Sequence, residues 1–180
     1  VGNLYLLQVD NFIGFNPQSA SNTTLGDFRT MGMELQLKWQ LEKLHVNANY
    51  SFFTVEKSNI DSFKIPSNKD AVLGIPNHMF KADFHYRFNA NSRFHILGRV
   101  ISGQYACTND PNFICGKPEK LDAIYDVNAF YQYRTTHTLW NIGIKNILNS
   151  NVYAVQPFKG GQSPINHEST RIMLDFQYSF

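Results

Sequence analysis

Apolar and polar residues alternate along most of this chain, and the clearest example is its last segment, residues 170–180 (TRIMLDFQYSF). Successive side chains of a β-strand point to opposite faces, so this alternation predicts a strand with one apolar face and one mainly polar face. The apolar set is Ile172, Leu174, Phe176, Tyr178 and Phe180, and the other set is Arg171, Met173, Asp175, Gln177 and Ser179. We expect this strand to separate two different solvents.

Earlier segments of similar length repeat the pattern. We expect strands at residues 3–12, 29–40, 44–55, 78–88, 93–104, 121–133, 138–148 and 170–180, of which the first alternates least regularly. The connections are long and polar at residues 11–27, 56–77, 105–120 and 149–169, and short at residues 41–43, 89–92 and 134–137. Long loops alternating with tight turns are typical of outer-membrane barrels. The sequence therefore predicts an all-β fold, an antiparallel up-and-down transmembrane β-barrel wall of about eight strands.

Aromatic residues gather at the strand ends that adjoin the short turns or the last residue. They are Trp39, Phe88, Phe94, Tyr133, Trp140 and Phe180, with Leu44 beside them. A soluble antiparallel barrel also meanders, but it has no reason to place its aromatic side chains at one level. We therefore expect these residues to form an aromatic girdle at a membrane interface.

Composition agrees with a barrel wall. The aromatic share is 14% and the mean hydropathy is −0.32, and no apolar run is long enough for a membrane helix. Low hydropathy does not exclude a membrane, because a barrel strand turns only every second residue to lipid. A net charge of +2 is too small to indicate a nucleic-acid partner. Since the chain starts at Val1 and shows no signal peptide, we expect a processed product or a piece of a longer protein.

The chain has two cysteines, Cys107 and Cys115, in the third long connection. A disulfide between them would suit an oxidising compartment and would contribute about 2.5 kcal/mol by loop closure. Free or metal-binding thiols are the alternative, although metal sites usually have tighter spacing and further ligands. We expect the disulfide.

Several stretches resemble the C-terminal barrel of TonB-dependent outer-membrane receptors, and they occur in the order found in that family. They are residues 32–39 (GMELQLKW), 47–52 (NANYSF), 75–81 (IPNHMFK), 98–104 (GRVISGQ), 142–148 (IGIKNIL) and the terminal Phe180. The most specific is the Gly-x-Lys-Asn-Ile-Leu stretch that starts at Gly143 and is followed by Tyr153. The chain departs from the family at residues 166–171 (NHESTR), where Pro-Gly often precedes the arginine, so we expect the last loop to differ in shape.

The resemblance implies that residues 1–180 are a single C-terminal segment of a barrel of about 22 strands, without the N-terminal plug domain of the family. It implies the outer membrane of a Gram-negative bacterium and uptake of a scarce nutrient, for which a ferric chelate (siderophore) is our main expectation. The implied partners are outer-membrane lipid, the plug, the remaining barrel strands and, through the plug, an energy-transducing inner-membrane complex. For ligand contact we single out loop residues Tyr105, Phe113, Tyr153, Gln156 and Phe158.

The predicted inner face carries charges of both signs. They are Glu34, Lys38, Lys81, Asp83, Arg87, Arg99, Asp126, Lys145, Arg171 and Asp175. These charges fit a wetted wall that pairs with itself or with a plug, and less well a transport path on their own. Three of the six histidines, His45, His85 and His95, also fall on this face, but no paired-ligand spacing supports a metal or haem site. We expect no metal and no cofactor, with a haem receptor using His167 as a minor alternative.

The sequence also bears on two other function classes. An enzyme would need a nucleophile, a base and an orienting group within reach of one another. Ser51, His85 and His95 are the residue types such a site would use, but they lie in no catalytic motif and fit a barrel wall equally well. We therefore expect no enzyme. A complete small eight-stranded barrel with a structural or adhesive role is the main alternative, because about eight tilted strands are enough to close a barrel.

Overall fold

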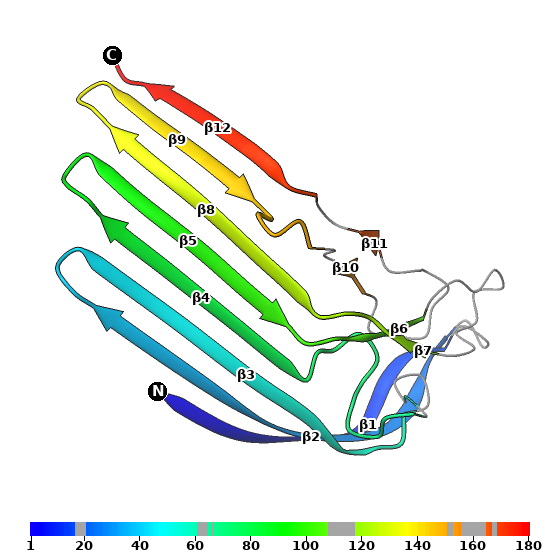
Figure 1. Cartoon of the computed structure of the whole chain (residues 1–180). Helices are drawn as coiled ribbons and strands as arrows, with labels where there is room; N and C mark the ends of the chain where they lie inside the picture. Colours follow the sequence, from blue (N-terminus) through cyan, green and yellow to red (C-terminus); the bar gives the residue numbers. More distant parts are fainter. Residues whose placement is uncertain are drawn as a thin grey trace.

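Eight long strands form one open antiparallel sheet in the computed structural model of the chain (Figure 1). The structure describes residues 1–16, 21–60, 65, 67–107, 118–150, 153–155, 165–166 and 169–180. The sheet consists of β1 (Gly2–Asn16), β2 (Ser21–Gln40), β3 (Leu44–Ser58), β4 (His78–Arg87), β5 (Ser92–Ile101), β8 (Ile124–Arg134), β9 (Thr138–Lys145) and β12 (Arg171–Tyr178). Two small hairpins pair β6 (Tyr105–Cys107) with β7 (Pro118–Lys120), and β10 (Tyr153–Ala154) with β11 (Ile165–Asn166).

The order of strands in the sheet is their order in the chain, which confirms the predicted up-and-down arrangement. The short turns lie along one margin of the sheet, and the long connections with the two small hairpins gather at the other (Figure 1). β1 and β12 are the two edges, and in the described residues they are not paired with each other. The sheet is therefore not the closed small barrel considered as the alternative.

Register keeps the predicted faces together across the whole sheet. On one face a continuous row runs through Leu37, Ala48, Ala82, Gly98 and Val127, each the direct partner of the next. On the other face the neighbouring row runs through Gln36, Asn49, Lys81, Arg99 and Asp126. A slip of one residue in the pairing would move all apolar side chains of a strand to the polar face. The hydrophobic pattern therefore stabilises the observed register over a slipped one.

The first predicted loop, residues 11–27, is wrong in extent. β1 continues to Asn16 and β2 begins at Ser21, so most of this polar segment is paired strand. The ladder accommodates the change with irregularities around Phe12, where Asn11 has a φ of 56° and Gly26 a φ of 134°. A hairpin wetted on both faces can be polar throughout, and for this reason its composition resembled that of a loop.

The predicted loops 105–120 and 149–169 also contain paired strands, β6 with β7 and β10 with β11. Each of these strands is only two or three residues long, too short for a sequence pattern to reveal. The other strand ends differ from the predicted ones by three residues or fewer. In the described part of the chain, no helix has the length and apolar character needed to cross a membrane.

The most deeply buried apolar side chains belong largely to the long connections rather than to the middle of the sheet. They are Ile60, Ile65, Val72, Leu73 and Ala106. Backbone hydrogen bonds join the connections to the strands and to one another: Val55 N–H donates to the Asp70 carbonyl (3.3 Å), and Gly74 N–H donates to the Tyr105 carbonyl (2.8 Å). This end of the wall is therefore a packed structure in the described residues, which positions Tyr105.

Candidate functional site

One face of the sheet carries apolar side chains on all eight strands, and large apolar side chains are exposed there on every strand except β3, where they are half-buried. Its members include Leu4, Leu35, Leu37, Phe80, Tyr125, Tyr131, Ile142, Ile144, Ile172 and Leu174, all of them exposed. Leu37 is 60% exposed and Leu174 is 68% exposed, although each lies within a regular strand. Monomeric soluble proteins rarely expose apolar patches larger than a few hundred Å². This face therefore has the character of a surface for lipid.

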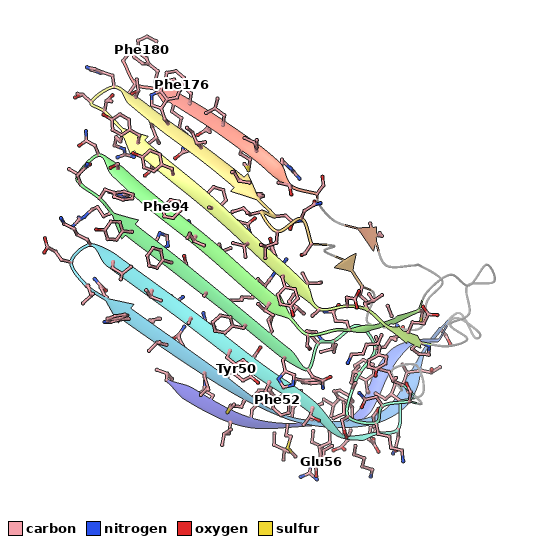
Figure 2. The ribbon with its side chains drawn as sticks, in the orientation of Figure 1. Tyr50, Phe52, Glu56, Phe94, Phe176 and Phe180 are labelled. Atoms are coloured by element: carbon pink, nitrogen blue, oxygen red, sulfur yellow. The ribbon has the colours of Figure 1, made fainter. Side chains whose placement is uncertain are left out.

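The predicted girdle residues lie at the margin with the short turns. Tyr133 and Trp140 are direct cross-strand partners on β8 and β9, and the Trp140 ring lies 4.4 Å from that of Phe176 on β12. The rings of Phe88 and Tyr131 are 6.4 Å apart, and Phe180 packs edge-on against Tyr178. Figure 2 shows Phe94, Phe176 and Phe180 toward the short turns, with Tyr50 and Phe52 toward the long connections.

The opposite face is a network of polar side chains that bridge neighbouring strands. Arg99 Nη2 donates to Asp126 Oδ2 at 3.0 Å, and the Asn128 amide donates to Asp126 Oδ1 at 3.1 Å. Farther toward the short turns, the Gln132 amide donates to Asn141, which in turn donates to Asp175. The best-connected charges thus pair within the wall, which favours the interpretation of this face as a wetted wall.

A second group on this face joins one carboxylate to two histidines. Asp83 Oδ1 lies 2.6 Å from His95 Nε2 and 3.0 Å from His85 Nε2. The two imidazole rings are stacked, with centroids 3.9 Å apart and planes at 12°. His45 is the cross-strand partner of His85 on the other side, so three histidines share one row of the sheet. Among the described residues, Asp83, His85 and His95 form the group with the donor atoms to hold a metal ion.

The alternation placed these histidines on the inner face, but their spacing along the chain does not reveal that they form a group. The predicted turn at residues 89–92 contained the missing signal. A hairpin folded about that turn brings residue 85 beside residues 95 and 96, and keeping the polar side chains on one face selects His95, the partner that the structure shows. Asp83 is then the diagonal neighbour of His95 on the same face.

The long-connection end contains a hollow of about 350 Å³. It is lined by Phe52, Thr54, Asn68, Asp70, Asn77, His78, Ser102, Gly103, Tyr105 and Lys120. His78 and Phe52 form a cross-strand pair in a row of the apolar face, and His78 Nδ1 lies 2.8 Å from the Tyr50 hydroxyl. Hydroxyl, amide, carboxylate and ammonium groups therefore meet at the level where the apolar face reaches the connections.

The predicted ligand-contact residues are only partly described. Tyr105 is half-buried in β6 and lines this hollow, and Tyr153 begins β10, in a separate two-stranded sheet. Phe113, Gln156 and Phe158 lie outside the described residues, as does His167. Cys107 is disulfide-bonded at the end of β6. Its predicted partner Cys115 also lies outside the described residues, so this pairing stays a prediction.

The Gly-x-Lys-Asn-Ile-Leu motif that starts at Gly143 contains a buried asparagine, Asn146, just after the end of β9. Asn146 is buried and has a φ of 47°. Its Oδ1 accepts a hydrogen bond from the Ser150 N–H (3.0 Å), and its Nδ2 donates to the Ser150 carbonyl (2.9 Å). The Asn128 side chain accepts from the Asn146 N–H, and the Thr170 hydroxyl donates to the Asn146 carbonyl. Asn tolerates left-handed backbone and bonds locally, so it suits the end of this strand.

Comparisons with known proteins agree with this architecture. Residues 2–147 match the family described as TonB dependent receptor-like, beta-barrel. Among solved structures, the chain is similar to the ferric-catecholate import receptor Fiu of E. coli K12, with a TM-score of 0.71 and 15% identity over 99% of this chain and 25% of that one. It is also similar to the ferripyoverdine receptor of the Pseudomonas aeruginosa outer membrane (TM-score 0.72, 15% identity, 99% and 25%).

The FrpB iron transporter of Neisseria meningitidis is similar as well (TM-score 0.66, 14% identity, 99% of this chain and 28% of that one). The chain thus spans between a quarter and a third of the length of these solved structures. No curated protein sequence matched the chain. At these identities, the structural likeness establishes the fold.

Proposed function

Because this chain belongs to the TonB-dependent receptor β-barrel family, we propose that it forms part of the wall of an outer-membrane receptor that imports a ferric chelate. The observation that carries the proposal is the register-matched pair of faces. Apolar side chains line one face on all eight strands and are exposed on seven of them, and the other face is a bonded polar network. Such a wall suits lipid on one side and a polar interior on the other.

The open edges support a segment of a larger barrel over a small closed one. β1 and β12 each pair on one side only in the described residues, so each edge presents unpaired backbone groups. An unpaired edge cannot face hydrocarbon, because each unsatisfied N–H or C=O there costs several kcal/mol. In our proposal further strands pair with both edges and complete a barrel of about 22 strands, and a plug occupies its interior. Energy for import would reach the plug from an inner-membrane complex.

The ferric chelate is inferred from what similar proteins are stated to bind, namely a ferric catecholate and ferripyoverdine. In this proposal the long connections hold the ligand-contact residues Tyr105, Phe113, Tyr153, Gln156 and Phe158. The position of Tyr105 supports this assignment, because it lies at the packed long-connection end of the wall, beside the charged residues Asp70 and Lys120. The role is transport, in agreement with a family of transport receptors rather than enzymes.

Uptake of iron-labelled chelates by iron-starved cells tests the proposal. We expect a strain that lacks the intact protein to lose uptake of one chelate from a panel of catecholate, hydroxamate and mixed siderophores. The gene should restore that uptake, and a protonophore should abolish it. Unchanged uptake of every chelate, with the protein present in the outer membrane of the parent strain, would contradict import and leave a structural role for the wall.

A further inference from the structure

We propose that Asp83, His85 and His95 form a binding site for a divalent first-row transition metal ion on the polar face of the wall. The site is separate from the hollow beside Tyr105 and does not depend on which chelate is imported. It uses two imidazole nitrogens and one carboxylate oxygen, carried by the neighbouring strands β4 and β5. Sites on paired strands are held more rigidly than sites on loops.

The donor atoms already converge on one point. Both Nε2 atoms lie within 3.0 Å of the same carboxylate oxygen, and all the donor atoms lie within 4.8 Å of one another. A tetrahedral zinc site with bonds of about 2.0–2.1 Å places its donors roughly 3.3 Å apart. A metal ion therefore fits between these three groups after small side-chain rotations that open the two hydrogen bonds.

The chemistry of the donors selects the class of metal. Imidazole nitrogen with carboxylate oxygen suits Zn²⁺, Cu²⁺, Ni²⁺ or Fe²⁺, whereas Mg²⁺ and Ca²⁺ prefer oxygen ligands alone. Three protein ligands leave at least one coordination position for water or another group. The side chains of His85 and His95 are 51% and 30% exposed, so an ion can enter from the polar side.

Positively charged side chains surround the proposed site, so metal binding depends strongly on the Asp83 carboxylate. Arg87 and Arg93 form the next cross-strand pair on this face toward the short turns, and they repel a cation. Lys43 lines the same small hollow as His45 and His85. Asp83 is the group that offsets this positive charge at the site itself. We therefore expect its neutral replacement to weaken metal binding as strongly as loss of the imidazoles.

Zinc titration of the purified intact protein that contains this chain tests the site. The protein is folded in detergent micelles, stripped of metal, and titrated with Zn²⁺ against a chromophoric chelator. Variants H85Q/H95Q and D83N should lower zinc affinity by at least about tenfold, since loss of a direct ligand should cost no less than loss of an outer-shell partner. The control H137Q removes a histidine in the 135–137 turn and should leave the affinity unchanged.

Co²⁺ gives a second readout that does not depend on affinity alone. A four- or five-coordinate site with two imidazoles should produce strong visible absorption in the parent protein and in H137Q, and this absorption should be absent in H85Q/H95Q. Heat-modifiable electrophoretic migration shows that each variant is folded. Unchanged zinc affinity in folded H85Q/H95Q, or unchanged cobalt absorption, would overturn the proposal whatever the outcome of the chelate-uptake experiment.

Discussion

His85 and His95 lie directly opposite each other on β4 and β5, with their rings stacked 3.9 Å apart. Both rings direct Nε2 to the same oxygen of Asp83, at 3.0 and 2.6 Å. One carboxylate thus fixes two side chains from adjacent strands. The arrangement links the hairpin on its polar face near the short turn, away from the apolar contacts.

Replacing Asp83 by Asn should weaken this link in metal-free protein. The amide keeps an oxygen acceptor but loses the charge, so we expect the free energy of unfolding to fall by about 1 kcal/mol. Urea unfolding of the intact protein in lipid vesicles measures the change. Asp122→Asn, at an exposed position before β8, is the matched control and should stay within about 0.5 kcal/mol of the parent. Equal effects of the two substitutions would contradict a bonded role for Asp83.

Arg99 and Asp126 should behave as a coupled pair. Their ion pair is 3.0 Å long, and the side chains are 36% and 17% exposed, so solvent screening limits its contribution. A double-mutant cycle with Arg99→Gln and Asp126→Asn should give a coupling free energy of about 0.5–1 kcal/mol. The coupling should decrease at high salt. Strict additivity of the two substitutions would mean that the contact contributes nothing measurable.

Ile96 and Leu97 offer a direct test of the two faces. Ile96 pairs with Phe84 and Ala129 on the apolar face, whereas Leu97 pairs with Asp83 and Asn128 on the polar face. An arginine on the lipid side costs about 2–4 kcal/mol near the middle of a bilayer. Ile96→Arg should therefore lower the folded fraction in vesicles, and Leu97→Arg should change it far less. A stronger effect of Leu97→Arg would reverse the assigned faces.

Position 143 requires glycine because the ring of its cross-strand partner Phe130 occupies the space that a side chain would need. A Cβ atom built at this position would collide with the Phe130 ring, whereas one at Gly98 would meet only the Ala82 carbonyl, 4.0 Å away. Gly143→Ala should therefore destabilise the intact protein by about 1–3 kcal/mol. Gly98→Ala should be neutral or slightly stabilising, because alanine restricts the unfolded chain. Thermal unfolding of both variants checks the contrast, which would fail if the two shifts were equal.

Asn146 should tolerate few substitutions. Asn146→Ala removes both hydrogen bonds between its side chain and the Ser150 backbone and places an alanine in left-handed backbone. We expect a loss of about 2–3 kcal/mol from the unbonded groups and the strain. Asn149 also has a positive φ, 47°, but is exposed. Asn149→Ala should cost less, and equal losses would contradict a special role for the buried Asn146.

Alternation was enough to predict the strands and faces of the wall, because side chains of the two kinds must meet different solvents. Ile142 and Leu174, for example, fall on the apolar face as predicted and are cross-strand partners. The pairing of His85 with His95 follows from the short turn together with the alternation, which places both histidines on the polar face. By contrast, the pairing of His45 with His85 depends on how residues 59–77 between β3 and β4 fold, and no local pattern determines that.

The sequence also carries no signal for contacts between long connections that lie far apart in the chain. Leu73 bridges to Tyr105 in parallel fashion, and both lie in segments that the sequence marked only as polar loops. The long β1–β2 hairpin was missed because Ser, Thr, Asn and Gly favour turns, whereas here Thr23 and Thr24 are paired with Gly14 and Ile13. Pairing with a partner strand outweighed the composition of the segment.

If the wall lies in the outer membrane as proposed, the length of β2 determines how far this part of the protein extends beyond the lipid. At about 3.3 Å per residue, its 20 residues extend roughly 65 Å, whereas the apolar band of an outer-membrane barrel is only about 25 Å tall. Even at a tilt of about 45°, roughly 20 Å of the β1–β2 hairpin stands clear of the lipid. In the outer-membrane orientation proposed above, antibodies, phage tails and protein toxins that approach the cell can contact this projecting hairpin.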